Sequence, residues 1–319
     1  MTLHCSILDD YQNVAFSMAD WSVLDDQVEV RNYNQYFQSA DELIHAVQDC
    51  EILVIMRERT KFPADVLQRL SSLKLLVTTG MRNASIDLQA AHQLGITVCG
   101  TGGKGAAPTE LTWALILGIT RHVVQENNAF RQGDAWQSTI GIGLYGKTLG
   151  LIGLGKIGKA MATIAQAMGM SVLAWSPNLT AERAQEAGVT LATSLHELLR
   201  QSDIVSVHMV LSETTRHLLG KQELEQMKPT AYLINTSRSG LVDQQAMVEA
   251  LQQHTIAGAG LDVFDEEPLP LDHVLRTLPN VLATPHIGYV SDDNYQTFYQ
   301  DAVDDIVQFL QGTPVRELK

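Results

Sequence analysis

Cysteine is scarce in this sequence, and its three cysteines are far apart. Cys5, Cys50 and Cys99 match no metal-binding spacing, and three cysteines cannot all pair within one chain. Disulfide frameworks belong to oxidising compartments. We therefore expect reduced, mostly buried thiols and no metal site.

The sequence also lacks long hydrophobic runs and an excess of positive charge. No run reaches the roughly 18 apolar residues that a membrane-spanning helix needs. The opening residues, MTLHCSILDDYQ, turn acidic at once and lack the basic segment and cleavage site of a secretion signal, so we expect a cytoplasmic protein. The net charge of −14 argues against nucleic acid and anionic membranes as partners. A small anionic ligand would need a local cluster of donors and cations.

What the chain does contain is a globular composition and a repeated alternation of elements. With 319 residues, 45% of them hydrophobic, it is long enough for two domains. Short apolar runs typical of buried parallel strands alternate with helical segments. We expect strands at SILDD, EILVIM, LKLLVTTG and ITVCG, and then at LGLIGLG, SVLAW, DIVSVHM, AYLINTS, AGAGLDVF and VLATPHIG. This order predicts an α/β fold with doubly wound parallel sheets.

Two helical segments frame the second series of strands. A glycine-rich break at residues 101–108 is followed by residues 109–130, which the pattern predicts to form one long helix. A last helix is expected after Gly288, ending at Gly312.

Residues 149–162, LGLIGLGKIGKAMA, carry the glycine spacing of a dinucleotide-binding loop. Gly153 permits a tight turn, Gly155 lets a pyrophosphate approach the backbone, and Gly158 lets the helix pack closely on the strand. The phosphates would lie on the N–H groups that open the following helix. Because the pattern stands between an apolar strand and a helix, we expect a dinucleotide site. The alternative is a plain strand-to-helix turn.

The position expected to bind the adenine ribose is unusual. An acidic residue at the end of SVLAWSPN would bind both ribose hydroxyls and repel a 2′-phosphate, but Ser176 stands there. Asn178 and Thr180 could donate hydrogen bonds to such a phosphate, and Arg183 could reach it. NADP is therefore admissible and slightly favoured. NAD stays open because no arginine lies immediately beside Ser176.

Three later segments supply a guanidinium, a carboxylate and an imidazole at strand ends, where this kind of sheet binds ligands. They are INTSRSGLVD, GLDVFDEEP and TPHIG. Reduction of a ketone by hydride needs a proton donor, and His286 suits this role because imidazole exchanges protons near neutral pH. Glu267 would orient the ring and favour its protonated form, while Arg238 can bind a substrate carboxylate and polarise the adjacent carbonyl. Singly, each could instead be a surface cation, a solvated acid or a structural histidine.

Taken together, the motifs resemble the D-isomer-specific 2-hydroxy-acid dehydrogenase family, which includes phosphoglycerate, glyoxylate/hydroxypyruvate and D-lactate dehydrogenases. The likeness runs in order along nearly the whole chain through LKLLVTTG, TEL, GKTLGLIGLGKIG, HMVLSETTRHLL, MKPTAYLINTSRSGLVD, GLDVFDEEPLP and LPNVLATPHIG. It implies a Rossmann-type NAD(P)-binding domain at residues 102–287. It also implies a flavodoxin-like substrate domain at residues 1–101, completed by residues 288–319, with the active site in the cleft.

The resemblance also implies roles for individual residues. Arg238, Glu267 and His286 would be the catalytic set. Backbone N–H groups around Gly80 and Met81 would receive the substrate carboxylate, with Arg82 in the same loop. The implied cofactor contacts are Gly153, Gly155, Lys156, Ile157, Gly158, Ser176, Pro177, Met209, Val210, Thr215, Thr236, Ser237, Arg238, Asp262, His286 and Gly288. His208 would lie close to the cofactor in a positional role.

Departures from the family pattern leave the substrate open. Ser239 stands where glycine commonly follows the arginine, Val210 replaces a usual proline, and the TTGMRNASID loop is longer than usual. Arg57, Arg59 and Arg82 would favour a second anionic group on the substrate, or else face solvent. Glyoxylate, hydroxypyruvate, phosphohydroxypyruvate and bulkier 2-keto acids all remain.

The implied reaction is hydride transfer between NAD(P)(H) and C2 of a small 2-keto or 2-hydroxy acid. A dinucleotide-sensing, co-repressor-like regulator of the same fold is the alternative, and the intact trio argues against it. Formate dehydrogenases share the fold but have an amide where Glu267 stands. The apolar segment 109–130 suits the family's two-fold dimer contact, so we expect a homodimer. Trp136 would lie in the core or an interface, or reach a partner's substrate pocket.

Overall fold

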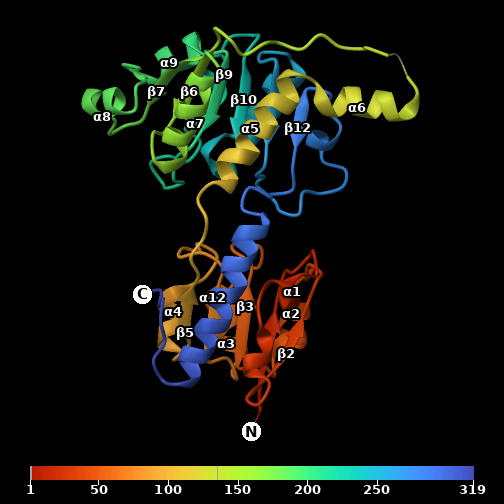
Figure 1. Cartoon of the computed structure of the whole chain (residues 1–319), viewed down its shortest axis with the longest axis vertical. Coiled ribbons are helices and arrows are strands. Elements are labelled where there is room, and N and C mark those ends of the chain that lie inside the picture. Colours follow the sequence, from red (N-terminus) through yellow and green to blue (C-terminus); the bar gives the residue numbers. More distant parts are fainter. Residues whose placement is uncertain (1, 135) are drawn as a thin grey trace. The chain divides into compact units, whose positions relative to one another are not determined.

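The computed structural model describes residues 2–134 and 136–319, and the chain divides into two compact units (Figure 1). The first unit comprises the chain up to Lys104 together with Val290–Lys319. The second unit is Gly105–Tyr289. The chain therefore crosses between the units twice, after Lys104 and after Tyr289.

The first unit is built on a five-stranded parallel sheet. Its strands are β1 (Leu3–Ile7), β2 (Val28–Asn32), β3 (Ile52–Ile55), β4 (Leu75–Thr78) and β5 (Thr97–Gly100). Their order is β2-β1-β3-β4-β5, the flavodoxin-like order, which confirms that prediction. Strand β2 was not anticipated. It is an edge strand whose valines alternate with charged and polar residues, so it lacks the apolar run by which buried parallel strands are recognised.

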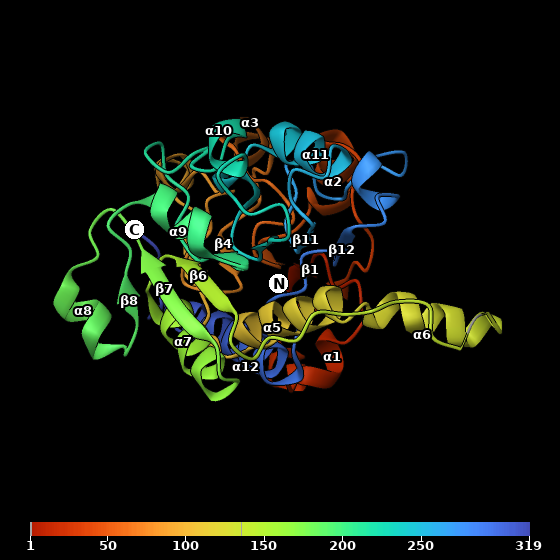
Figure 2. The same cartoon turned by 90° about the horizontal axis from the view of Figure 1, so that it is seen from above.

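Helices cover both faces of this sheet. They are α1 (Ala15–Met18), α2 (Ala40–Val47), α3 (Ala64–Arg69), α4 (Leu88–Gln93) and α12 (Asp292–Leu310), with a 3₁₀ turn at Trp21–Leu24. Helices α2, α3 and α4 pack over one face, and α12 lies beside α1 on the other, as Figure 2 shows. Trp21 meets Tyr299 of α12 edge-on, with ring centroids 6.3 Å apart. In the described part of the chain, no helix is long and apolar enough for a membrane crossing.

The second unit carries a seven-stranded parallel sheet. Its strands are β6 (Thr148–Ile152), β7 (Ser171–Trp175), β8 (Thr190–Leu191), β9 (Ile204–Val207), β10 (Tyr232–Asn235), β11 (Gly258–Leu261) and β12 (Val281–Ala283). The order β12-β11-β10-β9-β6-β7-β8 is the Rossmann order extended by one strand, as predicted. Strand β8 was missed because two residues carry no periodicity.

Both faces of the second sheet are also covered. One face is packed by α5 (Ala107–Thr120), α7 (Lys156–Ala167) and α8 (Ala181–Glu186). The other is packed by α9 (Leu195–Gln201), α10 (Lys221–Leu224) and α11 (Gln244–Gln252). Two 3₁₀ turns, Ser239–Leu241 and Val274–Arg276, complete the unit.

The prediction of one long helix at residues 109–130 is wrong. Helix α5 ends at Thr120, and a second helix, α6 (Val123–Gln132), begins after His122, whose φ of 52° is left-handed. No glycine or proline marks this break, so local pattern could not reveal it. Helix α6 has no buried residue and extends away from the sheet of its unit (Figures 1 and 2).

Trp136, just after α6, is 81% exposed, which excludes the core position considered for it. Its ring packs against that of Phe130, with centroids 6.1 Å apart. Both aromatic side chains therefore belong to an exposed apolar surface around α6.

The three cysteines are free and buried, as predicted. Burial raises the pKa of each thiol, which keeps it protonated at neutral pH. A thiol is a poor nucleophile and metal ligand, so these residues serve packing.

Candidate active site

The strand register of the second unit brings six loops to one edge of the sheet. Pairing aligns the last residues of six of the seven strands, Ile152, Trp175, Val207, Asn235, Leu261 and Ala283. The residues that follow them are Gly153, Ser176, His208, Thr236, Asp262 and Thr284. They lie in a row at the carboxyl edge, where doubly wound sheets bind ligands. The strand order reverses between β6 and β9, so the ligand is expected there.

Each glycine of the loop after β6 has its own steric reason. Gly153 has a φ of 102°, and a Cβ there would lie 2.5 Å from the carbonyl oxygen of His208. A Cβ on Gly158 would collide with the carbonyl oxygen of Gly153. A Cβ on Gly155, by contrast, would project into open space. The backbone thus packs tightly at Gly153 and Gly158 and leaves open space beside Gly155.

This open space fits the pyrophosphate of a dinucleotide. Gly155 opens the 12-residue helix α7, whose N-terminus is capped by no side chain, and Lys156 beside it is exposed. Such an N-terminus favours an anion through its N–H groups and the helix dipole. In the described part of the chain, the buried Nδ1 of His208 has no hydrogen-bond partner, which leaves a polar atom for a ligand at the same edge.

The loop after β7 lies next to the glycine loop, because the N–H of Gly153 donates to the carbonyl oxygen of Trp175 at 2.8 Å. Ser176 is half-buried there, while Pro177 is exposed. The Arg183 guanidinium donates to the backbone oxygen of Asn178 at 3.3 Å. The arginine that sequence analysis placed at some distance is therefore tied to the loop that contains Ser176.

The loop after β9 is shaped by its own hydroxyl groups. Thr215 Oγ1 donates to the carbonyl oxygen of Val210 at 2.8 Å and accepts from the N–H of Ser212 at 2.8 Å. Met209 is half-buried, and Val210 is 72% exposed. Thr215 thus supports the loop that presents Val210 to solvent.

His208 is held as a neutral ring at the start of that loop. Its Nε2 lies 2.9 Å from Ser206 Oγ, and burial lowers its pKa to about 4. A neutral imidazole there agrees with the positional role expected for it.

Arg238 follows β10 in a loop held by its neighbours. The Asn235 side chain donates to the Arg238 carbonyl oxygen at 3.0 Å and accepts from the Ser237 N–H at 3.1 Å. Ser237 Oγ donates to the last carbonyl oxygen of β9 at 2.7 Å. The Arg238 guanidinium donates through Nη1 to the Ser237 carbonyl oxygen at 2.8 Å. These contacts hold the half-buried guanidinium at the carboxyl edge.

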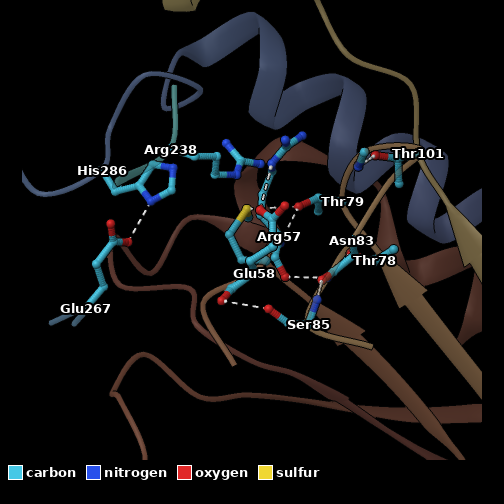
Figure 3. A network of polar contacts seen from close by, with 12 residues as sticks. Arg57, Glu58, Thr78, Thr79, Asn83, Ser85, Thr101, Arg238, Glu267 and His286 are labelled. Atoms are coloured by element: carbon cyan, nitrogen blue, oxygen red, sulfur yellow. Dashed lines mark hydrogen bonds and ion pairs between the residues drawn. The ribbon is translucent and has the colours of Figure 1, made fainter. Parts of the chain in front are cut away.

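His286 and Glu267, which are 19 residues apart in sequence, meet directly. Their Nδ1 and Oε2 atoms are 2.6 Å apart (Figure 3). The other carboxylate oxygen accepts from the Phe264 N–H at 2.9 Å, which fixes the carboxylate. Because Nδ1 faces a carboxylate, Nδ1 carries a proton and Nε2 is the ring atom left for exchange. The φ of His286 is 53°, a strained conformation for a non-glycine residue.

Asp262 anchors the loop that carries His286. Its carboxylate is fully buried and accepts from Thr284 Oγ1 at 2.7 Å and from the N–H groups of Ile287 and Gly288 at 2.8 Å. Burial raises the pKa of Asp262, and these hydrogen bonds partly offset that effect. Asp262 therefore supports the loop that carries His286. The family likeness implied only that Asp262 lies near the nicotinamide.

In the first unit, two loops after β3 and β4 are joined by polar contacts (Figure 3). Asn83 Nδ2 donates to the carbonyl oxygen of Arg57 and to Thr78 Oγ1, and the Arg57 N–H donates to Thr79 Oγ1. The Gly80 N–H donates to Thr101 Oγ1 at 2.8 Å. The Gly80 N–H, which is expected to receive a substrate carboxylate, thus has Thr101 Oγ1 as its partner in this structure.

The three arginines of this unit differ in their surroundings. Arg82 is exposed, as is Met81. Arg59 does not face solvent freely: its Nη1 donates to the carbonyl oxygen of Asp9 at 2.6 Å, and its Cζ lies 4.4 Å from the centroid of the Tyr11 ring. Arg57 has Nε 3.8 Å from a carboxylate oxygen of Glu58.

Known proteins resemble both the whole chain and its second unit. The profile of the D-isomer specific 2-hydroxyacid dehydrogenase NAD binding domain matches residues 113–288. A glyoxylate reductase of Aeropyrum pernix is 38% identical over 261 residues, which is 79% of this chain and 78% of that enzyme. A D-3-phosphoglycerate dehydrogenase of Methanocaldococcus jannaschii is 35% identical over 274 residues. That match covers 85% of this chain but only 52% of the enzyme, so the chain spans about half of its length.

A solved structure of the same kind covers both units. The phosphoglycerate oxidoreductase of Vibrio cholerae o395 has a TM-score of 0.92 and 34% identity, covering 98% of this chain and 100% of that one. The fold, the glycine loop and the matching profile together define the class of protein. It is an α/β protein with a domain that binds a nicotinamide dinucleotide. The chain belongs to the D-isomer-specific 2-hydroxyacid dehydrogenase family, as the resemblance predicted.

Several supporting contacts at this edge are not predicted by the sequence motifs. Thr284 holds Asp262, the Phe264 N–H holds Glu267, and Thr112 Oγ1 of α5 lies 2.7 Å from Thr236 Oγ1. The threonine of the TPH motif offered a signal for the first contact, because it stands beside the expected histidine. The Phe264 N–H is a backbone group, and Thr112 lies in a helix far in sequence from Thr236, so no motif pointed to either contact.

Proposed function

We propose that this chain is an NAD(P)-dependent oxidoreductase acting on the CH–OH group of a small 2-hydroxy acid, or on the corresponding 2-keto acid. The observation that carries the proposal is the 2.6 Å contact of His286 with Glu267, at the same sheet edge as the glycine loop. The names of the related glyoxylate reductase and phosphoglycerate dehydrogenases support it.

The dinucleotide, when bound, supplies or accepts the hydride at C4 of its nicotinamide. In reduction, His286 donates a proton from Nε2 to the nascent alkoxide oxygen, and in oxidation it takes that proton back. Glu267 holds the Nδ1 proton throughout and stabilises the positive ring. Arg238 binds the substrate carboxylate and polarises the neighbouring carbonyl.

We also propose the distribution of binding residues. The loops around Gly155, Ser176, Val210 and Thr236 would bind the dinucleotide. Further cofactor residues implied by the family likeness lie in or next to these loops or in the His286 loop. They are Lys156, Ile157, Pro177, Met209, Thr215, Ser237, Asp262 and Gly288. In the first unit, the exposed Met81 and Arg82 would contribute to substrate binding, which makes that unit the substrate domain.

NADP is the cofactor we favour. No acid stands at Ser176 to repel a 2′-phosphate, and the Arg183 guanidinium is tied to Asn178 two residues further on. A cation there would attract the phosphate.

A substrate panel tests the proposal. Glyoxylate, hydroxypyruvate, phosphohydroxypyruvate and a branched 2-keto acid would each be assayed with NADH and NADPH. We expect at least one keto acid to be reduced with a kcat of about 1 s⁻¹ or more, and a higher kcat/KM for NADPH than for NADH. Dinucleotide binding without reduction of any keto acid would instead support the regulator of the same fold.

We propose further that the chain forms a homodimer through α5 and α6. Exposed apolar side chains gather in this part of the second unit: Leu117, Val123, Val124, Phe130, Trp136, Ile140 and Tyr145. A groove of about 240 Å³ lies among Leu117, Arg121, Ile142, Gly143, Leu144, Tyr145 and Met168. Exposed apolar patches of this kind commonly mark an interface.

Sedimentation equilibrium tests the dimer. The protein is expected at twice the mass of the chain, and Phe130→Asp is expected to sediment as a monomer because it buries a charge at the contact. Lys159→Asp on α7, an exposed site outside the apolar patch, is the control and should stay dimeric. A monomeric wild-type protein would contradict the assignment.

The three free thiols support a reducing compartment such as the cytoplasm, which fractionation of cells would check.

A further inference from the structure

Tyr289 lies directly against the proposed general acid. Its ring centroid is 5.6 Å from that of the His286 imidazole, and the two ring planes are inclined at 73°, an edge-to-face arrangement. Tyr289 is only 8% exposed. The tyrosine is therefore a packed neighbour of the imidazole rather than a surface side chain.

The backbone between the two rings is fixed. Asp262 accepts hydrogen bonds from the N–H groups of both intervening residues, Ile287 and Gly288. A Cβ on Gly288 would lie 3.0 Å from the Asp262 carboxylate, so the loop passes close to that group. Because the buried carboxylate holds this segment, the spacing of the two rings is set by the fold.

The hydrogen bond to Glu267 alone does not determine the plane of the imidazole. It constrains one atom, Nδ1, while the second side-chain torsion of histidine has broad energy wells. Coupled changes of the first and second side-chain torsions can still move Nε2 while Nδ1 stays in contact with Glu267. An aromatic ring packed at 73° opposes this swing, since edge-to-face pairs have a preferred geometry.

We propose that Tyr289 is a positioning residue: its ring holds the plane of the His286 imidazole so that Nε2 is presented to the substrate oxygen. This inference rests on the proposed function, in which Nε2 transfers the proton. Small displacements of a reacting group reduce the rate strongly, so the effect belongs to kcat rather than to dinucleotide binding.

Two substitutions in the full chain test the proposal, with the keto acid that the wild-type protein reduces fastest. Tyr289→Phe keeps the ring and is expected to keep a kcat close to wild type. Tyr289→Leu keeps an apolar side chain but removes the aromatic ring, and it is expected to lower kcat about tenfold, with the KM for the dinucleotide unchanged. The solvent deuterium isotope effect on the kcat of Tyr289→Leu should rise, because proton transfer becomes slower than the other steps.

A matched control separates positioning from stability. Tyr232→Leu removes a tyrosine that is also buried in the second unit, on β10, and should lower stability while leaving kcat unchanged. Each kcat is calculated per dinucleotide-binding site, counted by fluorescence titration, so that partial unfolding does not imitate a loss of rate.

The outcomes are distinct. A wild-type kcat and isotope effect in Tyr289→Leu would overturn the positioning role, and so would a phenylalanine variant as impaired as the leucine variant. A wild-type protein that reduces no keto acid would instead reject the proposed function itself.

Discussion

Replacement of His286 by alanine is expected to lower kcat by about 10²-fold or more. The alkoxide would lose its proton donor, and Glu267 would lose the ring that it holds at 2.6 Å. Dinucleotide affinity is expected to survive, because the open space at Gly155 lies on another loop. Steady-state kinetics and a fluorescence titration with the dinucleotide measure the two quantities separately.

The chain offers a matched control for this substitution. His254 has a φ of 54°, close to the 53° of His286, and is exposed after α11. His254→Ala therefore also replaces a histidine that has a left-handed backbone conformation, but it leaves the proposed site unchanged. Near-normal activity in His286→Ala would reject its assignment as the general acid, and equal losses in both variants would point to backbone strain.

The second large effect is expected in the glycine loop, where two alanine substitutions should fail in different ways. In Gly155→Ala the new methyl group enters open space, so stability should match wild type while dinucleotide affinity falls about tenfold or more. In Gly158→Ala the methyl group meets the Gly153 carbonyl oxygen, which is backbone and cannot swing aside. We expect a loss of about 1–3 kcal/mol in the free energy of unfolding, together with loss of binding.

Thermal unfolding without ligand and a dinucleotide titration distinguish the two variants. The contrast between them is the informative quantity, since both add one methyl group and the two sites are three residues apart at the start of α7. Wild-type affinity in Gly155→Ala would show that the pyrophosphate does not lie over this residue. An unchanged melting temperature in Gly158→Ala would show that the helix and strand can separate at little cost.

Much of the fold was predictable because it depends on local pattern. Strands β3, β4, β6 and β9 are short, mostly apolar and mostly buried, which is typical of parallel strands. The glycine spacing identified the strand-to-helix turn at β6 and α7, and the Rossmann order followed from the family likeness. The family resemblance, which the sequence profile confirms, came from motifs that are contiguous in the chain.

The elements that sequence analysis missed have weak local signals. Strand β2 alternates polar and apolar residues at a sheet edge, and β8 is two residues long. The break at His122 has neither glycine nor proline. In each case the element depends on pairing or on backbone geometry that a window of neighbouring residues does not encode.

For the site, the sequence by itself determined the residue types and their positions at strand ends: the glycine loop, Arg238, Glu267 and His286. The tertiary structure alone decided which atoms meet. It brought Glu267 to Nδ1 of His286, used Asp262 to hold the histidine loop, and committed the Gly80 N–H to Thr101. The physical reason is range: periodicity and turn chemistry act over a few residues, whereas tertiary contacts join distant ones. Strand register pairs Ile152 with Val207. Hydrogen bonds join His286 to Glu267, 19 positions apart, and Ile287 to Asp262, 25 positions apart.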